Sequence, residues 1–105
     1  EKTNHRGLDF AGNEGEGVYA ADAGVIVYSG WNNYGYGNMI MIDHGNGFQS
    51  LYAHLSALYR GCGQSVGQGE AIGAVGSTGR SSGAHLHFEL MAGIKVNPWD
   101  YLPPP

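Results

Sequence analysis

Residues 81–91 read SSGAHLHFELM, and the alternation of apolar and polar side chains in this stretch predicts a β-strand. One face of that strand would carry Leu86, Phe88 and Leu90. The other face would carry His85 and His87, whose backbone positions lie about 6 to 7 Å apart, so that both imidazoles can border one small site. A single histidine is usually a structural or surface residue, but this pair favours a metal site or a catalytic site.

The remainder of the sequence also consists of short apolar runs separated by glycine-rich turns. The run that begins at Phe48 alternates as well. One face of this strand would carry Leu51, Ala53 and Leu55, and the other face would carry Ser50, Tyr52 and His54. Asn46-Gly47, just before it, is a strong hairpin signal. The predicted strands are Val18–Ala21, Val25–Trp31, Met39–His44, Phe48–Leu55, Ala71–Val75, His85–Met91 and Ile94–Val96.

These strands predict a mainly β fold built of antiparallel β-sheets with long glycine-rich loops. The chain has 105 residues, 19 of them glycine, and a length that suits one domain over residues 1–105. Its 42% of apolar residues can form a core, and its 13% of charged residues is far from the composition of a disordered chain.

The charge and the composition disfavour several classes of function. The formal net charge is −4 and the basic residues are scattered, so nucleic acid is an unfavoured partner. No apolar run approaches the roughly 18 to 20 residues of a membrane helix. The glycine-rich stretch before residue 85 lacks the GxGxxG and GxxxxGK patterns of nucleotide-binding loops. The only cysteine, Cys62, excludes an internal disulfide.

A second candidate pair of ligands lies near the start of the chain, in HRGLD. His5 and Asp9 would be about 13 Å apart on a straight strand, but Gly7 between them permits a bend. Together with His54 in YAHL and the pair at positions 85 and 87, they supply three metal ligands and two spare imidazoles. A catalytic zinc site typically has three protein ligands and one open position. The spacing alone leaves open which histidines would bind the metal.

These motifs carry a resemblance that covers nearly the whole chain. The segments HRGLDF, GVYAADAGVIVYSGW, IDHGNG, LYAHLS, GQSVGQGEAIGAVGSTGRSSGAHLHFEL and VNPWDYL resemble the lysostaphin and LytM type of zinc metalloendopeptidase. The resemblance implies that His5, Asp9 and His87 bind one Zn²⁺ per chain and that His54 and His85 are catalytic. It also implies a fold whose loops form a substrate groove, which agrees with the predicted strands.

The same resemblance implies that the chain is an enzyme of the bacterial cell envelope or the extracellular space. It would hydrolyse peptide stems or cross-bridges of peptidoglycan through a zinc-activated water. Glycyl-glycine bridges and D-alanyl-diaminopimelate links both occur among the family's substrates, and we favour the second. The alternative is a non-catalytic LytM-like module that binds the cell wall or activates an amidase, but such modules usually lack several of the ligands. The abrupt start at EKTN suggests the catalytic part of a longer protein with other domains.

Three further features have interpretations of their own. His44, in the HGNG turn, is expected to be structural rather than a metal ligand. Glu89 follows the two histidines on their strand face, and we expect a carboxylate at the surface or the groove edge rather than one that orients an imidazole. The aromatic residues of 31–37 (WNNYGYG) would either line a substrate groove or pack over the sheet edge, and the sequence leaves both open.

Overall fold

A computed structural model describes residues 7–92 of the chain, and within this range every regular element is a β-strand. The strands are β1 (Gly7–Ala11), β2 (Gly17–Tyr19), β3 (Gly24–Asn32), β4 (Gly37–Asp43), β5 (Phe48–Leu55), β6 (Ala57–Leu58), β7 (Ser65–Val66), β8 (Ala71–Ala74) and β9 (His85–Ala92). The predicted fold class, antiparallel and mainly β, is confirmed. His5 and the predicted strand Ile94–Val96 lie outside the described residues.

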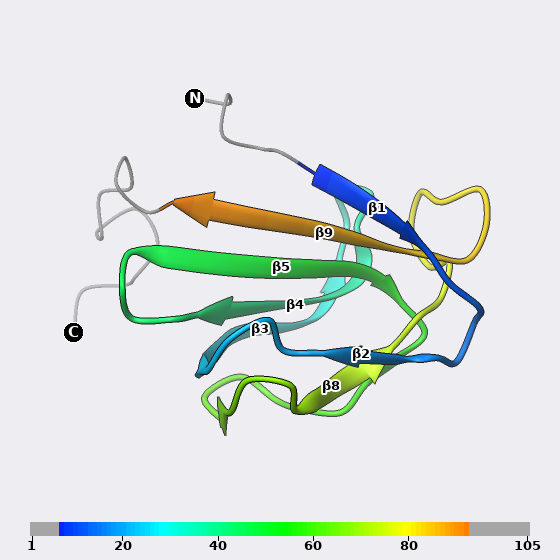
Figure 1. The fold of residues 1–105 in the computed structure, drawn as a ribbon. Helices are drawn as coiled ribbons and strands as arrows, with labels where there is room; N and C mark the ends of the chain where they lie inside the picture. The colour runs from blue at the N-terminus through cyan, green and yellow to red at the C-terminus, as the bar shows by residue number, and fades with distance from the viewer. Residues whose placement is uncertain (1–6, 93–105) are drawn as a thin grey trace.

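Two antiparallel sheets form the fold (Figure 1). The larger sheet has the order β1-β9-β5-β4-β3-β7, so that β9, near the end of the chain, lies between β1 and β5. The smaller sheet has the order β2-β8-β6. The hairpin predicted at Asn46-Gly47 joins β4 to β5, and both glycines of the turn, Gly45 and Gly47, have positive φ. The short strands β1, β6 and β7 are additions to the predicted set.

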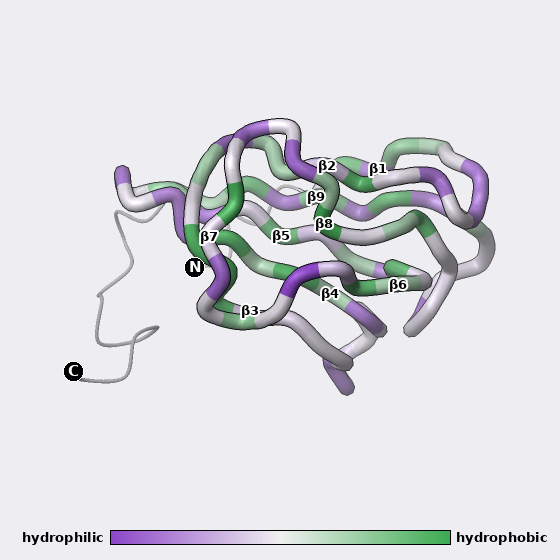
Figure 2. Tube along the Cα trace, turned by 90° about the horizontal axis from the view of Figure 1, so that it is seen from below, coloured by the Kyte–Doolittle hydropathy of each residue, from purple (hydrophilic) through white to green (hydrophobic). Residues whose placement is uncertain are grey.

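Each face of the larger sheet carries a cluster of buried hydrophobic residues, and its strands accordingly contain many hydrophobic segments (Figure 2). On one face the main core packs against the smaller sheet; its buried members include Ile26, Ile40, Tyr52, Leu55 and Ile72. On the opposite face, a second cluster is centred on Met39, Leu51 and Ala53. Phe88 of β9 packs against the main core, so the alternation of β9 directs His85, His87 and Glu89 to the face of the second cluster.

The alternation expected for β5 is wrong at its end. Asn38 of β4 pairs with Leu55, whereas Ile40 pairs with Tyr52, so two steps along β4 correspond to three steps along β5. This extra residue is a β-bulge, and it returns Leu55 to the face of Tyr52 instead of that of Ala53. The residue inside the bulge is His54, which has a φ of 63°.

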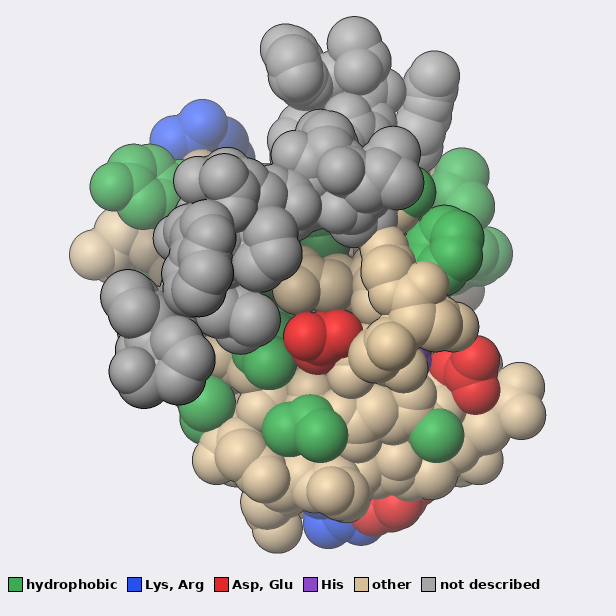
Figure 3. Space-filling model, turned by 90° about the vertical axis from the view of Figure 1, so that its left-hand side faces the viewer, with side chains coloured by type: hydrophobic (Ala, Val, Ile, Leu, Met, Phe, Trp, Pro, Cys, Tyr) green, Lys and Arg blue, Asp and Glu red, His purple; other side chains and the backbone are tan. Residues whose placement is uncertain are grey.

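The surface of the described residues has few charged side chains. One side of the molecule shows isolated carboxylates and no cluster of lysine or arginine among the described atoms (Figure 3). Residues 7–92 contain no helix long and apolar enough to cross a membrane.

Candidate functional site

Strand register brings Asp9 and His87 together from opposite ends of the sequence. Asp9 of β1 pairs with His87 of β9, and His87 pairs in turn with Ala53 of β5, so the three residues form one row across the sheet. Asp9 Oδ1 lies 2.8 Å from His87 Nδ1 and 3.4 Å from His85 Nε2. The site therefore contains one carboxylate that faces two imidazoles.

The β-bulge brings His54 to the same site. With regular alternation its side chain would project to the face of Tyr52, but in the structure its ring centroid lies 5.0 Å from that of His85 and 5.9 Å from that of His87. Histidine tolerates the left-handed conformation better than most residues, and such conformations concentrate at functional sites. A local departure from strand geometry thus places the third imidazole.

Hydrogen bonds to main-chain carbonyls fix the tautomers of two of the histidines. His54 Nδ1 lies 2.7 Å from the Thr78 carbonyl oxygen, and His85 Nδ1 lies 2.9 Å from that of Gly83. A carbonyl oxygen only accepts, so Nδ1 carries the proton in both rings and Nε2 has a free lone pair in the neutral form. Both residues can therefore accept a proton at Nε2.

His87 is held between two carboxylates. Its Nδ1 faces Asp9, and its Nε2–H donates to Glu89 Oε2 at 2.9 Å. Glu89 is only 4% exposed, and the same Oε2 accepts a hydrogen bond from the Tyr36 hydroxyl at 2.8 Å. The expectation that Glu89 is a surface carboxylate is wrong. Glu89 orients an imidazole because the β3–β4 turn lays Tyr36 over it, with the Tyr36 ring 5.9 Å from the His87 ring.

The electrostatics of the site follow from these contacts. Burial lowers the pKa of His87, but the hydrogen bonds to Glu89 and Asp9 outweigh it, and the pKa lies above its usual value. The hydrogen bond from His87 lowers the pKa of Asp9. Burial, with a smaller effect of the neighbouring imidazoles, lowers the pKa of His54 and favours the neutral form of its ring. Burial and the bond to Glu89 raise the pKa of Tyr36 to about 12.

Asp9 and His87 have the chemistry and the separation of two zinc ligands. His87 needs a proton on each nitrogen to satisfy two carboxylates, and a metal cation at Nδ1 would take the place of one proton while Glu89 keeps the other. Two ligands of a tetrahedral zinc lie about 3.3 Å apart, and the 2.8 Å separation of Nδ1 and Asp9 Oδ1 would widen only slightly. Within residues 7–92 no group of three potential ligands is arranged to hold a metal ion, and the proposed third ligand, His5, lies outside that range.

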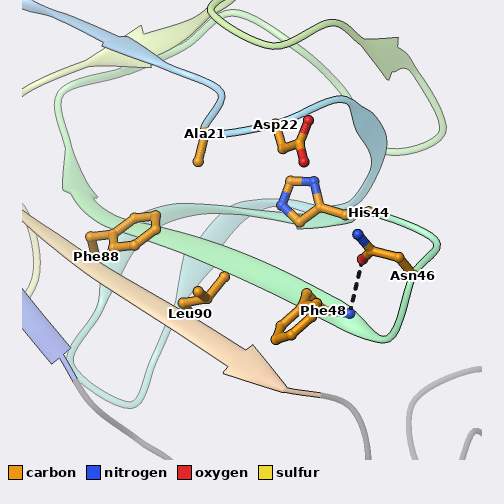
Figure 4. A pocket seen from close by; sticks show the side chains of 7 residues that line it. All are labelled: Ala21, Asp22, His44, Asn46, Phe48, Phe88 and Leu90. Atoms are coloured by element: carbon orange, nitrogen blue, oxygen red, sulfur yellow. Dashed lines mark hydrogen bonds between the residues drawn. The ribbon is translucent and has the colours of Figure 1, made fainter.

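Of the other predicted features, His44 lies apart from this row, whereas the 31–37 stretch contributes one residue to the site. The two nitrogens of His44 bond to the Ala23 carbonyl oxygen and the Ser50 hydroxyl, as expected of a structural histidine. His44 borders a pocket of about 280 Å³ on the far face of the sheet, toward which Phe88 and Leu90 point (Figure 4). In the 31–37 stretch, Tyr36 packs into the site, whereas Tyr34 is 87% exposed.

The chain is similar to known proteins over most of its length. The model of peptidase family M23 matches residues 3–98. The DD-carboxypeptidase/endopeptidase Mpg of Neisseria meningitidis is 52% identical over 95 residues, which is 90% of this chain and 22% of that protein. The murein hydrolase activator NlpD of Escherichia coli is 42% identical over 100 residues, 94% of this chain and 26% of that protein. This chain thus spans about a quarter of the relatives' length.

Two solved structures are similar at the level of the fold. The catalytic domain of the antimicrobial peptidase lysostaphin from Staphylococcus simulans superposes with a TM-score of 0.81 at 44% identity, over 84% of this chain and 67% of that one. A zinc-containing peptidase from Vibrio cholerae superposes with a TM-score of 0.78 at 36% identity, over 82% of this chain and 26% of that one.

Proposed function

Since the chain belongs to peptidase family M23, we propose that it is a zinc-dependent endopeptidase that hydrolyses peptide stems or cross-bridges of bacterial peptidoglycan. Residues 1–105 would form the single catalytic domain of a longer protein of the cell envelope or the extracellular space. The observation that carries the proposal is the convergence of Asp9, His54, His85 and His87 from three strands on one face of the sheet.

In this proposal Asp9 and His87, with His5, hold one zinc ion per chain. When bound, zinc would lower the pKa of a water molecule to about 7 and polarise the scissile carbonyl. The Nε2 atoms of two imidazoles would act beside the metal. His54 and His85 are each anchored through Nδ1, so both rings present a lone pair at a fixed position.

The chemistry of the two imidazoles suits general acid–base catalysis. One Nε2 accepts the proton of the attacking water, and the resulting imidazolium donates to the oxyanion or to the departing amine. The assignment of His85 as catalyst and His87 as ligand comes from the family resemblance, which does not divide the proton transfers between His54 and His85.

The proposal is tested on purified peptidoglycan with zinc analysis alongside. We expect about one zinc per chain in the wild type, lost in His87→Ala, and release of peptide fragments detected by mass spectrometry. His54→Ala and His85→Ala should keep zinc and lose at least a hundredfold in rate, the scale of general acid–base catalysis. Loss of zinc with no loss of hydrolysis would refute the metal-dependent mechanism.

The 42% identity to the murein hydrolase activator NlpD supports a second candidate, a non-catalytic module that activates an amidase. The two functions differ in what an added amidase changes. A module that activates would release no fragments alone from any wall type and would increase the release by an amidase, with His54→Ala as effective as the wild type. An enzyme releases fragments without the amidase and stops doing so in His54→Ala.

A further inference from the structure

A second concave surface lies beside the catalytic histidines, between two loops. It has a volume of about 390 Å³ and is lined by Trp31, Asn32, Asn33, Gly35, Gly79 and Arg80. The first four belong to the end of β3 and the β3–β4 turn, and the last two to the loop that precedes β9. We call it the Arg80 pocket.

Glycines hold the two loops together. The Arg80 amide donates to the Gly35 carbonyl oxygen at 2.8 Å. A Cβ on Gly37, which has a φ of 67°, would lie 2.5 Å from the Thr78 carbonyl carbon, and a Cβ on Gly79 would overlap the Gly37 backbone. Only glycine permits this close approach, so the position of Arg80 relative to the β3–β4 turn is fixed by main-chain packing.

The residues next to the Arg80 pocket contact the catalytic site directly. Thr78, two residues before Arg80, accepts the hydrogen bond from His54 Nδ1, and the hydroxyl of Ser81, just after it, lies 3.2 Å from His85 Nδ1. On the other loop, Tyr36 follows Gly35 and bonds to Glu89. The two loops that form the pocket therefore also anchor His54 and His85 and contact Glu89, so the pocket adjoins the catalytic site.

The side chains of the Arg80 pocket offer hydrogen-bond donors. Asn32 Oδ1 accepts from the Tyr34 amide at 2.7 Å, and Asn33 Oδ1 accepts from Trp31 Nε1 at 2.9 Å. Each amide oxygen already accepts one hydrogen bond, whereas no hydrogen bond is found for either NH₂ group within residues 7–92, so both groups can donate to a ligand. No acidic residue lines the pocket among the residues the structure describes.

Arg80 supplies the positive charge. It is exposed, and across residues 7–92 it makes no ion pair, whereas the only other arginine of that range, Arg60, pairs with Glu70 at 3.0 Å. A guanidinium with a planar fork of donors matches a carboxylate with two parallel hydrogen bonds. A cation and two amide donors in a hollow without acidic groups suit an anionic group of the substrate.

We propose that the Arg80 pocket is a substrate subsite that binds a free carboxylate of the peptide near the scissile bond. The inference rests on the proposed function and narrows it. Peptide stems carry free carboxylates, whereas a run of glycines has none along its length. The subsite would therefore favour cleavage next to a carboxylate-bearing residue over cleavage within a glycyl-glycine bridge.

The test uses two cross-linked stem peptides that differ only in one group near the scissile bond, a carboxylate in the first and a carboxamide in the second. The wild type should cleave the carboxylate peptide with a kcat/KM about tenfold above that for the carboxamide peptide. This is the usual scale of one pair of charge-assisted hydrogen bonds. In Arg80→Gln this ratio should fall to about one, through a higher KM for the acid only. Arg80→Lys, which keeps the charge but not the fork, should give an intermediate ratio.

Arg60→Gln is the matched control, because it removes an arginine that is already paired and does not line the pocket. It should leave the ratio unchanged. A purely structural role of Arg80 would lower the rates on both peptides equally and keep the ratio, which would overturn the proposal. Equal cleavage of both peptides by the wild type would overturn it too.

A measurement of peptide affinity tests the subsite independently of the endopeptidase activity. The affinities of the same two peptides for the zinc-loaded His85→Ala variant, with and without Arg80→Gln, are measured by calorimetry. A preference for the acid that disappears with Arg80→Gln supports the subsite even if the wild type cleaves neither peptide, an outcome that would count against the endopeptidase alone. Equal affinities would refute the subsite and leave the endopeptidase intact.

Discussion

Replacing Glu89 should weaken zinc binding without removing any ligand. Glu89 Oε2 accepts hydrogen bonds from His87 Nε2 and the Tyr36 hydroxyl, and its side chain is buried. In Glu89→Ala the His87 ring loses the acceptor that keeps Nε2 protonated and Nδ1 directed at Asp9. Loss of such a partner typically costs 10- to 100-fold in metal affinity, about 1.4 to 2.7 kcal/mol.

Two variants separate the effect of the Glu89 charge from that of the Tyr36 hydrogen bond. Glu89→Gln keeps an oxygen that can accept from both donors but removes the negative charge, and since charge-assisted hydrogen bonds are about twice as strong as neutral ones, its loss should be less than tenfold. Tyr36→Phe keeps the ring over His87 and removes only the hydroxyl, so it should lose a few-fold at most, on the scale of one hydrogen bond of about 0.5–1.5 kcal/mol.

The assay is competition for zinc with a chromophoric chelator at fixed pH, with circular dichroism to verify that each variant is folded. The expected order of affinity is wild type, Tyr36→Phe, Glu89→Gln, Glu89→Ala. A folded Glu89→Ala protein that binds zinc within twofold of the wild type would refute the reasoning, because the orientation of His87 would then not depend on Glu89.

Other predictions address the base, the sheet packing and the core. Burial and the neighbouring imidazoles hold the pKa of His54 below 6.5, and only its neutral form accepts a proton, so an NMR titration of the His54 ring should give a midpoint below pH 6.5; a midpoint above it would contradict this role. Gly7→Ala would place a methyl group against the His87 ring and should reduce zinc affinity about tenfold, whereas Gly67→Ala, with its nearest atom 4.0 Å away, should change nothing measurable by the same competition assay. Ile40→Ala, at a fully buried position, should lower the free energy of unfolding by about 2–5 kcal/mol in urea titrations, and a loss under 1 kcal/mol would show that the core is packed differently.

The sequence by itself determined the fold class and the chemical inventory of the site. The alternation in 85–91 and the Asn46-Gly47 turn are local signals, because side-chain direction repeats every two residues and a tight turn depends on its own residues. The histidines at 54, 85 and 87 and the carboxylate at 9 were also visible as candidate functional groups. Their roles as ligands or catalysts came from the resemblance of the motifs rather than from the spacing.

Only the tertiary structure decided how these groups meet. Asp9 faces His87 because β1 pairs with β9, 78 residues away, and strand register of that kind is set by contacts that no local pattern contains. His54 joins them because a β-bulge interrupts the alternation of β5, which the period of two could not predict. Glu89 is buried because Tyr36 arrives from another loop. Local patterns fix the direction of side chains along one strand, and long-range pairing fixes which of them become neighbours.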